Sequence, residues 1–448
     1  MAEKIKPRTL KGFRDYPPAT MIPREWIIET ARRVYRSYGF CPMDTPSLEH
    51  LEILLGNGSD ETDKQLYRFE DHGGRQVGLR FDLTVPLARF VAQHIQQLGT
   101  PYKRYQIANV WRGENTQRGR YREFMQCDFD TIGTTSLTAD IEMIMVMIDL
   151  LSALNVGEFT IHVNHRGILN GLLEKLGLTD KANGVLRTLD KLGKIGEERV
   201  RKELSDAVGA TESQADQLLA LTALAGTNEK MLAEAEKLTS GSEAGELGVA
   251  QLREAFEAVT STLPPESQSR IQFAPSICRG LDYYTGIVLE TTLNELPGIG
   301  SVASGGRYDN LADLYTKQQL PGVGASLGLD RLLAALEELE RLKQAQTTAQ
   351  VFIPYFESDR RNEYLKLATA LRNADIAVEF YPEAKKLGKQ LQYANRRGFR
   401  IALVIGGSEF DSDECQVKNL ATGDSKNIAY SDGNATELVA EINGILAD

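Results

Sequence analysis

Apolar and polar positions change their spacing several times along this chain, and the changes divide it into stretches of different predicted structure. Residues 23–38 repeat apolar side chains at helical spacing, and strands and helices follow up to about residue 165. Residues 166–270 are rich in Leu, Ala and Glu and predict helices throughout. Strand-like patterns return in residues 271–340. Beyond a polar linker, residues 348–448 alternate between strand and helix, which predicts a separate small α/β domain.

The most informative stretch is YQIANVWRGENTQRGRYREFMQCDFDTIG, which predicts two strands joined by a polar loop at residues 115–119. Alternation in the second strand places a polar set on one face: Arg120, Arg122, Phe124, Gln126, Asp128 and Asp130. With Arg112 and Arg118, four arginines lie within eleven residues. Guanidinium groups suit phosphate oxygens and a Phe between them can stack on a base, although a solvated hairpin face is the alternative.

The segment LRFDLTVPLARFV carries Asp82 and Thr84 two positions apart, on one face if the chain is extended there. Pro86 indicates the first turn of a helix. A carboxylate beside a hydroxyl is a suitable receptor for a substrate ammonium group. A helix cap followed by a turn explains the same residues, because Asp and Thr are common caps.

Three later segments combine strands with polar groups. In SICRGLDYYTGIVLE, Arg279 and Tyr284 stand at the head of a strand, where they suit a carboxylate and a ring, or form an ordinary polar turn. In SGGRYDNL, the glycines before Tyr308 let backbone approach a ligand closely, or make a tight hairpin turn. In GVGASLGLDRLL, small strand residues leave room for a flat ligand, and Arg331 in the next helix can reach phosphate.

The C-terminal domain carries a basic helix in an otherwise acidic chain, whose net charge is −11. No acidic residue occurs from 384 to 408, while that stretch holds six basic ones: Lys385, Lys386, Lys389, Arg396, Arg397 and Arg400. Such a local patch suits a phosphate backbone whatever the total charge, and Tyr393 is available for stacking on a base.

Composition narrows the classes further. The four cysteines form no CxxC pair, so a zinc site or disulfide framework is not expected and a reducing cytosol fits. His162 and His165 lack further ligands at metal-binding spacing and are expected to be structural. No stretch reaches the length of a membrane span, and the first residues lack the apolar run of a signal peptide.

The hairpin resembles motif 2 of the class II aminoacyl-tRNA synthetases, and GRYREFMQCDFD is similar to its histidyl-tRNA synthetase version. RGLDYYTG and SGGRYDNL resemble the histidine-specific motifs, GVGASLGLDRLL motif 3, and LGKQLQYANRRG the anticodon-binding domain. The helix at 23–38 resembles motif 1. The resemblance covers nearly the whole chain. It implies an α+β catalytic domain with a mixed or antiparallel sheet in two parts (1–165 and 271–340), a helical insertion (166–270) and a C-terminal α/β anticodon-binding domain (348–448).

The resemblance also implies roles for individual residues. Two arginines are expected to be catalytic, Arg112 at the α-phosphate and Arg279 between that phosphate and the histidine carboxylate. The expected ATP-binding residues are Arg112, Glu114, Phe124 and Arg331. The expected histidine-binding residues are Asp82, Thr84 and Gln126 for the ammonium group, Asp130 and Tyr284 for the imidazole, Tyr308 in the side-chain pocket, and Arg279. The expected tRNA-binding residues are Gln117, Lys385, Lys389, Arg396 and Arg397.

By the same resemblance the chain is expected to be a cytoplasmic histidine–tRNA ligase. It would join histidine to ATP, release pyrophosphate and then transfer the histidyl group to the 3′ end of histidine tRNA. Mg²⁺ would be bound mainly through the ATP phosphates, without a dedicated protein site, and motif 1 would form a homodimer. The alternative is a non-catalytic paralogue that regulates histidine biosynthesis. Such paralogues usually lack the anticodon domain and some motif arginines, which this chain retains.

Overall fold

The computed structural model describes residues 4–56, 64–277, 283–342, 346–431 and 434–447. The chain divides into two compact units. The first contains the residues up to Arg14 together with Ile27–Arg341, and the second contains Asp15–Trp26 together with Leu342–Asp448. Each unit is described by itself. No helix among the described residues has the length and apolar character needed to cross a membrane.

The first unit is built on a mixed sheet that, within the described residues, has eight strands. Their spatial order is β1 (Cys41–Pro42), β5 (Tyr102–Trp111), β6 (Glu123–Ile132), β11 (Gly322–Gly328), β10 (Ala303–Tyr308), β9 (Ile287–Leu293), β7 (Phe159–His165) and β8 (Ile271–Phe273). The two outer pairs, β1 with β5 and β7 with β8, are parallel, and the strands between them are antiparallel. The sequence-predicted hairpin is the β5–β6 pair.

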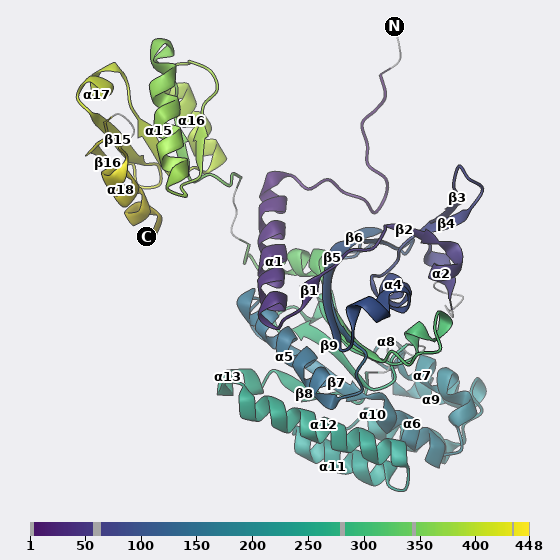
Figure 1. Cartoon of the computed structure of the whole chain (residues 1–448). Helices are drawn as coiled ribbons and strands as arrows, with labels where there is room; N and C mark the ends of the chain where they lie inside the picture. The colour runs from purple at the N-terminus through teal and green to yellow at the C-terminus, as the bar shows by residue number, and fades with distance from the viewer. Residues whose placement is uncertain (1–3, 57–63, 278–282, 343–345, 432–433, 448) are drawn as a thin grey trace. The chain divides into compact units, whose positions relative to one another are not determined.

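The two faces of this sheet differ because the side chains of β6 alternate between them. Helices cover the apolar face: α1 (Pro18–Ser37), α5 (Leu137–Ala153) and α14 (Leu329–Glu338). The Tyr35 ring of α1 lies 5.0 Å from that of Phe129, and its hydroxyl donates to the Cys127 carbonyl (2.9 Å). The opposite face carries Gln126 and its polar neighbours near α4 (Thr84–Leu98), which Figure 1 shows on the other side of the sheet. One face therefore forms the core and the other remains available for a site.

Helix α1 begins at Pro18, five residues before the predicted start, and Pro23 lies inside it. Proline is well accommodated at the first helical position, because the N–H that it lacks has no partner in that turn anyway. A small antiparallel sheet accompanies the main one in the order β2 (Leu48–His50), β4 (Gln76–Leu79) and β3 (Arg68–Glu70), with the short helix α2 (Leu51–Leu55) beside it.

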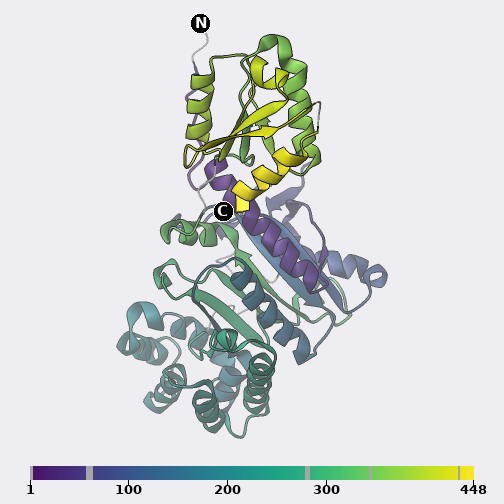
Figure 2. The ribbon, with the colours of Figure 1, turned by 90° about the vertical axis from the view of Figure 1, so that its left-hand side faces the viewer.

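Residues between β7 and β8 form the predicted helical insertion, which Figure 2 shows in teal at one end of this unit. It comprises α6 (Arg166–Lys175), α7 (Ala182–Leu189), α8 (Leu192–Ile195), α9 (Glu197–Asp206), α10 (Glu212–Thr222), α11 (Asn228–Thr239), α12 (Glu243–Thr262) and α13 (Pro265–Gln268). His165 links it to the sheet, since its Nδ1 accepts from the Gly167 amide (3.0 Å) and its Nε2 lies 2.8 Å from Gln251 of α12. His162 contacts Thr292 (3.0 Å). Both histidines thus have structural partners.

The second unit is an α/β domain with its own core. Its sheet, counted over the described residues, has five strands in the order β13 (Val378–Phe380), β12 (Val351–Ile353), β14 (Ile401–Val404), β15 (Glu414–Asn419) and β16 (Ser425–Ala429). Its helices are α15 (Arg361–Asn373), α16 (Leu387–Arg397), α17 (Gly407–Asp411) and α18 (Thr436–Ala447). The first three strands are parallel and the last two antiparallel to their neighbours. The pattern of the sequence did not predict β16, because this edge strand is mostly polar and exposed.

Candidate active site

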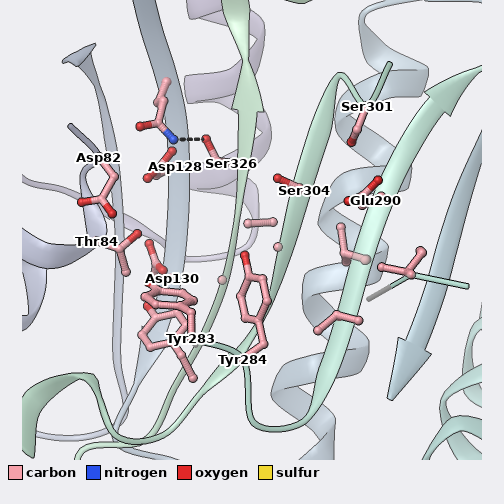
Figure 3. A pocket seen from close by; sticks show the side chains of 18 of the residues that line it. Asp82, Thr84, Asp128, Asp130, Tyr283, Tyr284, Glu290, Ser301, Ser304 and Ser326 are labelled. Carbon is pink, nitrogen blue, oxygen red and sulfur yellow. Dashed lines mark hydrogen bonds between the residues drawn. The ribbon is translucent and has the colours of Figure 1, made fainter. Parts of the chain in front are cut away.

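A cavity of about 410 Å³ opens on the polar face of the main sheet. Its walls come from β6, β9, β10, β11 and the start of α4. Figure 3 shows Asp82, Asp128 and Asp130 on one side of it, with Tyr284 and Glu290 on the other. Six of the predicted histidine-binding residues line this one cavity: Asp82, Thr84, Gln126, Asp130, Tyr284 and Tyr308.

A second, smaller cavity of about 140 Å³ adjoins the first. The two cavities share Arg112, Gln126, Ser326 and Arg331 among their lining residues, so they form one continuous groove. The smaller cavity is lined by every predicted ATP-binding residue: Arg112, Glu114, Phe124 and Arg331. The groove therefore has a carboxylate-rich end and an arginine-flanked end.

Alternation along β6 explains the carboxylate-rich floor. Asp128 and Asp130 follow Gln126 at intervals of two, so all three side chains point to the groove. On the neighbouring strand β11, a Cβ at Gly324 would overlap the Asp130 carboxylate, which explains the small residue there. Gln126 donates to the Ser326 hydroxyl (2.9 Å), a bond that Figure 3 marks.

Asp130 is held by two partners at the bottom of the groove. Arg104 of β5 lies 2.7 Å from its Oδ2, and the Tyr308 hydroxyl donates to its Oδ1. Burial raises the pKa of Asp130, and the Arg104 guanidinium opposes this shift. The carboxylate is present at the predicted place, but its orientation is set by these two neighbours.

Asp82 both contacts the start of α4 and lines the larger cavity. Its Oδ1 accepts a hydrogen bond from the Val85 amide (3.0 Å) in the first turn of α4, as a capping residue would. It also lines the larger cavity together with Thr84. Burial raises the pKa of Asp82, while hydrogen bonds from backbone amides and the charge of Arg112 oppose the rise. The capping interpretation is therefore confirmed, and the ammonium-receptor interpretation stays a prediction.

The arginine-flanked end is ordered by contacts from neighbouring segments. Arg112 Nε donates to the Phe81 carbonyl (2.9 Å), and its guanidinium lies 5.2 Å from the centre of the Phe124 ring. Arg331 donates to the Ser301 carbonyl. A flat ring and two guanidinium groups facing one cavity suit an aromatic base joined to phosphates.

Comparison with known proteins identifies the family of this chain. A family model described as "Histidyl-tRNA synthetase" matches residues 12–332, and one described as "Anticodon binding domain" matches residues 350–439. A histidine–tRNA ligase of Rhodopirellula baltica is 59% identical over 98% of this chain and 99% of its own length. The chain belongs to the histidyl-tRNA synthetase family.

Other relatives agree with this assignment. A histidine–tRNA ligase of Helicobacter hepaticus is 46% identical over 94% of this chain and 95% of its own length. The crystal structure of the histidyl-tRNA synthetase from Nostoc sp. PCC 7120 matches with a TM-score of 0.89 and 33% identity, covering 98% of this chain and 100% of that one. The predicted family, a class of aminoacyl-tRNA ligases specific for histidine, and the predicted class II fold are thereby confirmed.

The regulatory-paralogue alternative is not favoured. A Bacillus halodurans structure described as an ATP phosphoribosyltransferase regulatory subunit/histidyl-tRNA synthetase matches with a TM-score of 0.74 and 25% identity, covering 87% of this chain and 97% of that one. That likeness is weaker than the one to the Nostoc synthetase in both TM-score and identity.

Asp128 also lies in the pocket of this histidyl-tRNA synthetase family member, although the sequence assigned no role to it. It lies between Gln126 and Asp130 in the alternation of β6, and it lines the larger cavity. Burial raises its pKa to about 7, and Arg104 opposes the shift. The alternation already placed Asp128 on this face, but its depth depends on the strands packed around it.

Three groups of predicted residues lie away from the groove or outside the described ranges. Arg279 belongs to residues 278–282, which the structure does not describe. Gln117 is exposed in the β5–β6 loop, where its backbone N–H donates to the Arg120 carbonyl (3.2 Å). The four remaining residues predicted to contact tRNA lie in the second unit, on and just before α16: Lys385, Lys389, Arg396 and Arg397.

Basic residues on and just before α16 already pair with acidic residues of the same domain, which the sequence pattern did not indicate. Lys385 pairs with Glu383, and Arg397 lies 4.0 Å from Glu379 of β13. Tyr393, predicted as a stacking residue, donates its hydroxyl to Glu379 (2.6 Å), and its ring packs 5.8 Å from that of Phe352. These acidic partners lie before residue 384, outside the window in which the sequence shows only basic groups.

Proposed function

We propose that this histidyl-tRNA synthetase family member catalyses both steps of histidine transfer to tRNA. A carboxylate oxygen of histidine attacks the α-phosphorus of ATP, the bond to the β-phosphate breaks, and pyrophosphate leaves. The 3′-terminal hydroxyl of the tRNA then attacks the histidyl carbonyl and displaces AMP. The observation that carries the proposal is the continuous groove, whose carboxylate-rich end suits an amino acid and whose arginine-flanked end suits a nucleotide.

The carboxylate-rich end would select histidine. Asp82, Thr84 and Gln126 offer oxygen acceptors for the ammonium group at one side of the larger cavity. Deeper in, Asp130 would accept from one imidazole nitrogen and Tyr284 would bond the other. A site that satisfies a buried polar ring discriminates strongly against side chains that lack its hydrogen-bonding groups.

The Tyr308–Asp130–Arg104 contacts support this reading. Arg104 supplies a buried positive charge that favours the ionised form of Asp130, and the Tyr308 hydroxyl fixes one carboxylate oxygen. An ionised carboxylate accepts hydrogen bonds only, so a neutral imidazole would have to present an N–H to it. The network would thereby require that the ring nitrogen facing Asp130 carries a proton.

The arginine-flanked end would hold ATP. Phe124 would stack on adenine, Glu114 would accept from its amino group, and Arg331 would cover the nucleotide from the opposite side. Arg112 lines both cavities, which supports a role for it at the junction where the carboxylate and the α-phosphate would meet. Arg279 is proposed for the same junction on its motif alone. Fixed positive charge there would stabilise the negative charge that develops in the transition state.

Mg²⁺ is proposed to accompany ATP. Within the described ranges, no group of three or more His, Cys, Asp or Glu side chains could hold a metal ion. The proposed ion would be bound mainly by phosphate oxygens. Glu290 of β9, which lines the larger cavity, offers an oxygen ligand of the kind that Mg²⁺ prefers. Bound there, it would neutralise phosphate charge.

The tRNA contacts and the assembly belong to the same proposal. Lys385, Lys389, Arg396 and Arg397 would contact the anticodon stem-loop, and Gln117 in the exposed β5–β6 loop would meet the acceptor end. A homodimer formed through motif 1 and a cytoplasmic location are proposed by family likeness. Sedimentation that showed an active monomer would refute the dimer.

The deciding experiment is amino-acid-dependent exchange of labelled pyrophosphate into ATP without tRNA, with each of the twenty amino acids. Exchange with histidine alone is the expected result. Exchange with another amino acid would refute the roles given to Asp130 and Tyr284. No exchange by folded protein with Mg²⁺ would favour a non-catalytic paralogue. The variant Arg279→Ala would then test the role proposed for Arg279, with Arg187→Ala in the helical insertion as a matched control.

A further inference from the structure

Residues 11–14, here called the N-terminal strap, run beside the β5–β6 loop ahead of α1. The Gly12 carbonyl accepts a hydrogen bond from the Arg122 amide (2.9 Å), while the Arg122 carbonyl accepts from the Arg112 amide (2.9 Å). Gly12 has φ +87°, and a Cβ there would stand 2.7 Å from Arg122 Cγ and 2.9 Å from Thr116 Cγ2. The strap therefore needs glycine to approach the loop this closely.

Arg14, at the end of the strap, contacts two segments that lie far apart in sequence. Its Nη1 donates to the Tyr121 hydroxyl (3.0 Å), and its guanidinium lies 4.1 Å from the centre of the Tyr121 ring. Its Nη2 forms an ion pair with Asp330 Oδ1 (2.9 Å). One side chain thus joins the segment entering β6 to the first turn of α14.

Asp330 completes the connection from the other side. Its side chain is 1% exposed, and its second oxygen accepts from the Met125 amide of β6 (2.7 Å). A buried carboxylate requires such partners to remain ionised, and its negative charge is favourable in the first turn of a helix. The helix that carries Arg331 is therefore tied to β6 at the residue next to Phe124.

We propose that Arg14 is a positioning residue for the nucleotide end of the groove. Tyr121 and Asp330 line the smaller cavity together with Phe124 and Arg331, whereas Arg14 is not among the described residues that line either cavity. It acts through its two partners by holding the Phe124 wall and the Arg331 wall at a set separation. The proposal rests on the assignment of this cavity to ATP.

Loss of the Arg14 side chain is expected to weaken the binding of ATP but not that of histidine. Without Arg14, the Asp330 carboxylate keeps the Met125 amide donor but loses the Arg14 guanidinium, and the start of α14 is less firmly held. ATP binding must then order both walls, which raises the KM for ATP. Small misplacements of binding groups can cost up to about a hundredfold in rate. The contacts described for Arg14 reach Tyr121 and Asp330 and not the histidine end, so the KM for histidine is expected to stay within about twofold of the wild type.

The test compares the full-length wild type with Arg14→Gln, Arg14→Lys and Tyr121→Phe in pyrophosphate exchange, varying ATP and histidine separately. Arg8→Gln is the matched control, because Arg8 is an exposed arginine a few residues earlier in the chain. We expect Arg14→Gln to raise the KM for ATP about ten- to a hundredfold. Arg14→Lys should fall between it and the wild type, since lysine keeps the charge but cannot reach both partners with a planar fork. Tyr121→Phe keeps the ring and should give a smaller increase.

An ATP KM of Arg14→Gln equal to that of Arg8→Gln would overturn the proposal. So would parallel losses for ATP and histidine together with a lowered melting temperature, because that pattern indicates a purely structural role. If Arg14→Gln does not fold, Arg14→Lys and Tyr121→Phe decide on the same criteria. A wild type without any exchange would refute the proposed function instead. ATP titration by calorimetry would then still test Arg14, with unchanged affinity in Arg14→Lys and Tyr121→Phe counting against it.

Discussion

Arg104 and Asp130 form a buried ion pair beneath the groove. Their side chains are 0% and 5% exposed, and Arg104 Nη2 lies 2.7 Å from Asp130 Oδ2. The register of β5 against β6 places these two residues directly opposite each other. A carboxylate at this depth would be costly to ionise alone, so the neighbouring strand supplies the charge that the pocket needs.

Removing Arg104 should destabilise the fold more than removing an exposed arginine. Arg104→Met leaves Asp130 buried without its cation, and losses of about 3–5 kcal/mol are typical of such a change. The free energy of unfolding, measured by urea denaturation, is expected to fall by about this amount. Arg253→Met is the control, because its pair with Glu236 is about half exposed and should contribute at most about 1 kcal/mol. Equal losses in both variants would contradict the importance of burial.

Tyr308→Phe should weaken the use of histidine while the fold persists. The change removes the hydroxyl that donates to Asp130 and keeps the ring, which packs 5.2 Å from that of Tyr283. A hydrogen bond to a charged group contributes about 1.5–3 kcal/mol, so kcat/KM for histidine should fall about ten- to a hundredfold. The assay is pyrophosphate exchange with varied histidine. Tyr38→Phe removes a comparable bond, to Asp149 (2.6 Å) outside the groove, and should leave this ratio unchanged.

Asp128 should make stability depend on pH below neutrality. Its pKa is raised to about 7 by burial, so between about pH 4 and pH 7 the folded protein holds a proton that the unfolded chain has released. Its contribution to stability is therefore fully present below the unfolded pKa and is lost as pH rises through about 7. Asp128→Asn should gain melting temperature relative to the wild type as pH increases from 4 to 8. An identical pH profile for both proteins would show that Asp128 is ionised throughout.

Gly324→Ala should damage the histidine end through crowding. The added methyl group would overlap the Asp130 carboxylate, which is already held between Arg104 and Tyr308. Overpacking of this kind typically costs about 1–3 kcal/mol. We expect a lower melting temperature and a higher KM for histidine in the exchange assay. Gly193→Ala is the control, since it meets no atom within 4 Å and alanine favours its helix. A Gly324→Ala protein indistinguishable from this control would contradict the close packing.

The paired glycines of SGGRYDNL show where local sequence was insufficient. They were predicted to let backbone approach a ligand closely or to make a hairpin turn. They lie within strand β10, so the turn is wrong, while Gly305 lines the larger cavity. A Cβ at Gly306 would stand 2.8 Å from Tyr284 Cδ1, and one at Gly305 would collide with the Ala325 side chain of β11. At the place where each Cβ would stand, the space is filled by the protein's own atoms. Only the packing of β10 against its neighbours determines this.

By itself, the sequence determined the features that depend on residues close together along the chain. The period of β6 placed Gln126, Asp128 and Asp130 on one face, and the motif strings indicated the family and its fold. Only the tertiary structure decided which charged side chains contact each other, because these contacts depend on strand register and on how distant segments pack together. It set Arg104 opposite Asp130, Tyr308 on the same carboxylate, and Arg14 against Asp330, a residue 316 positions away. No spacing along the chain encodes such contacts, since they exist only after distant segments have packed.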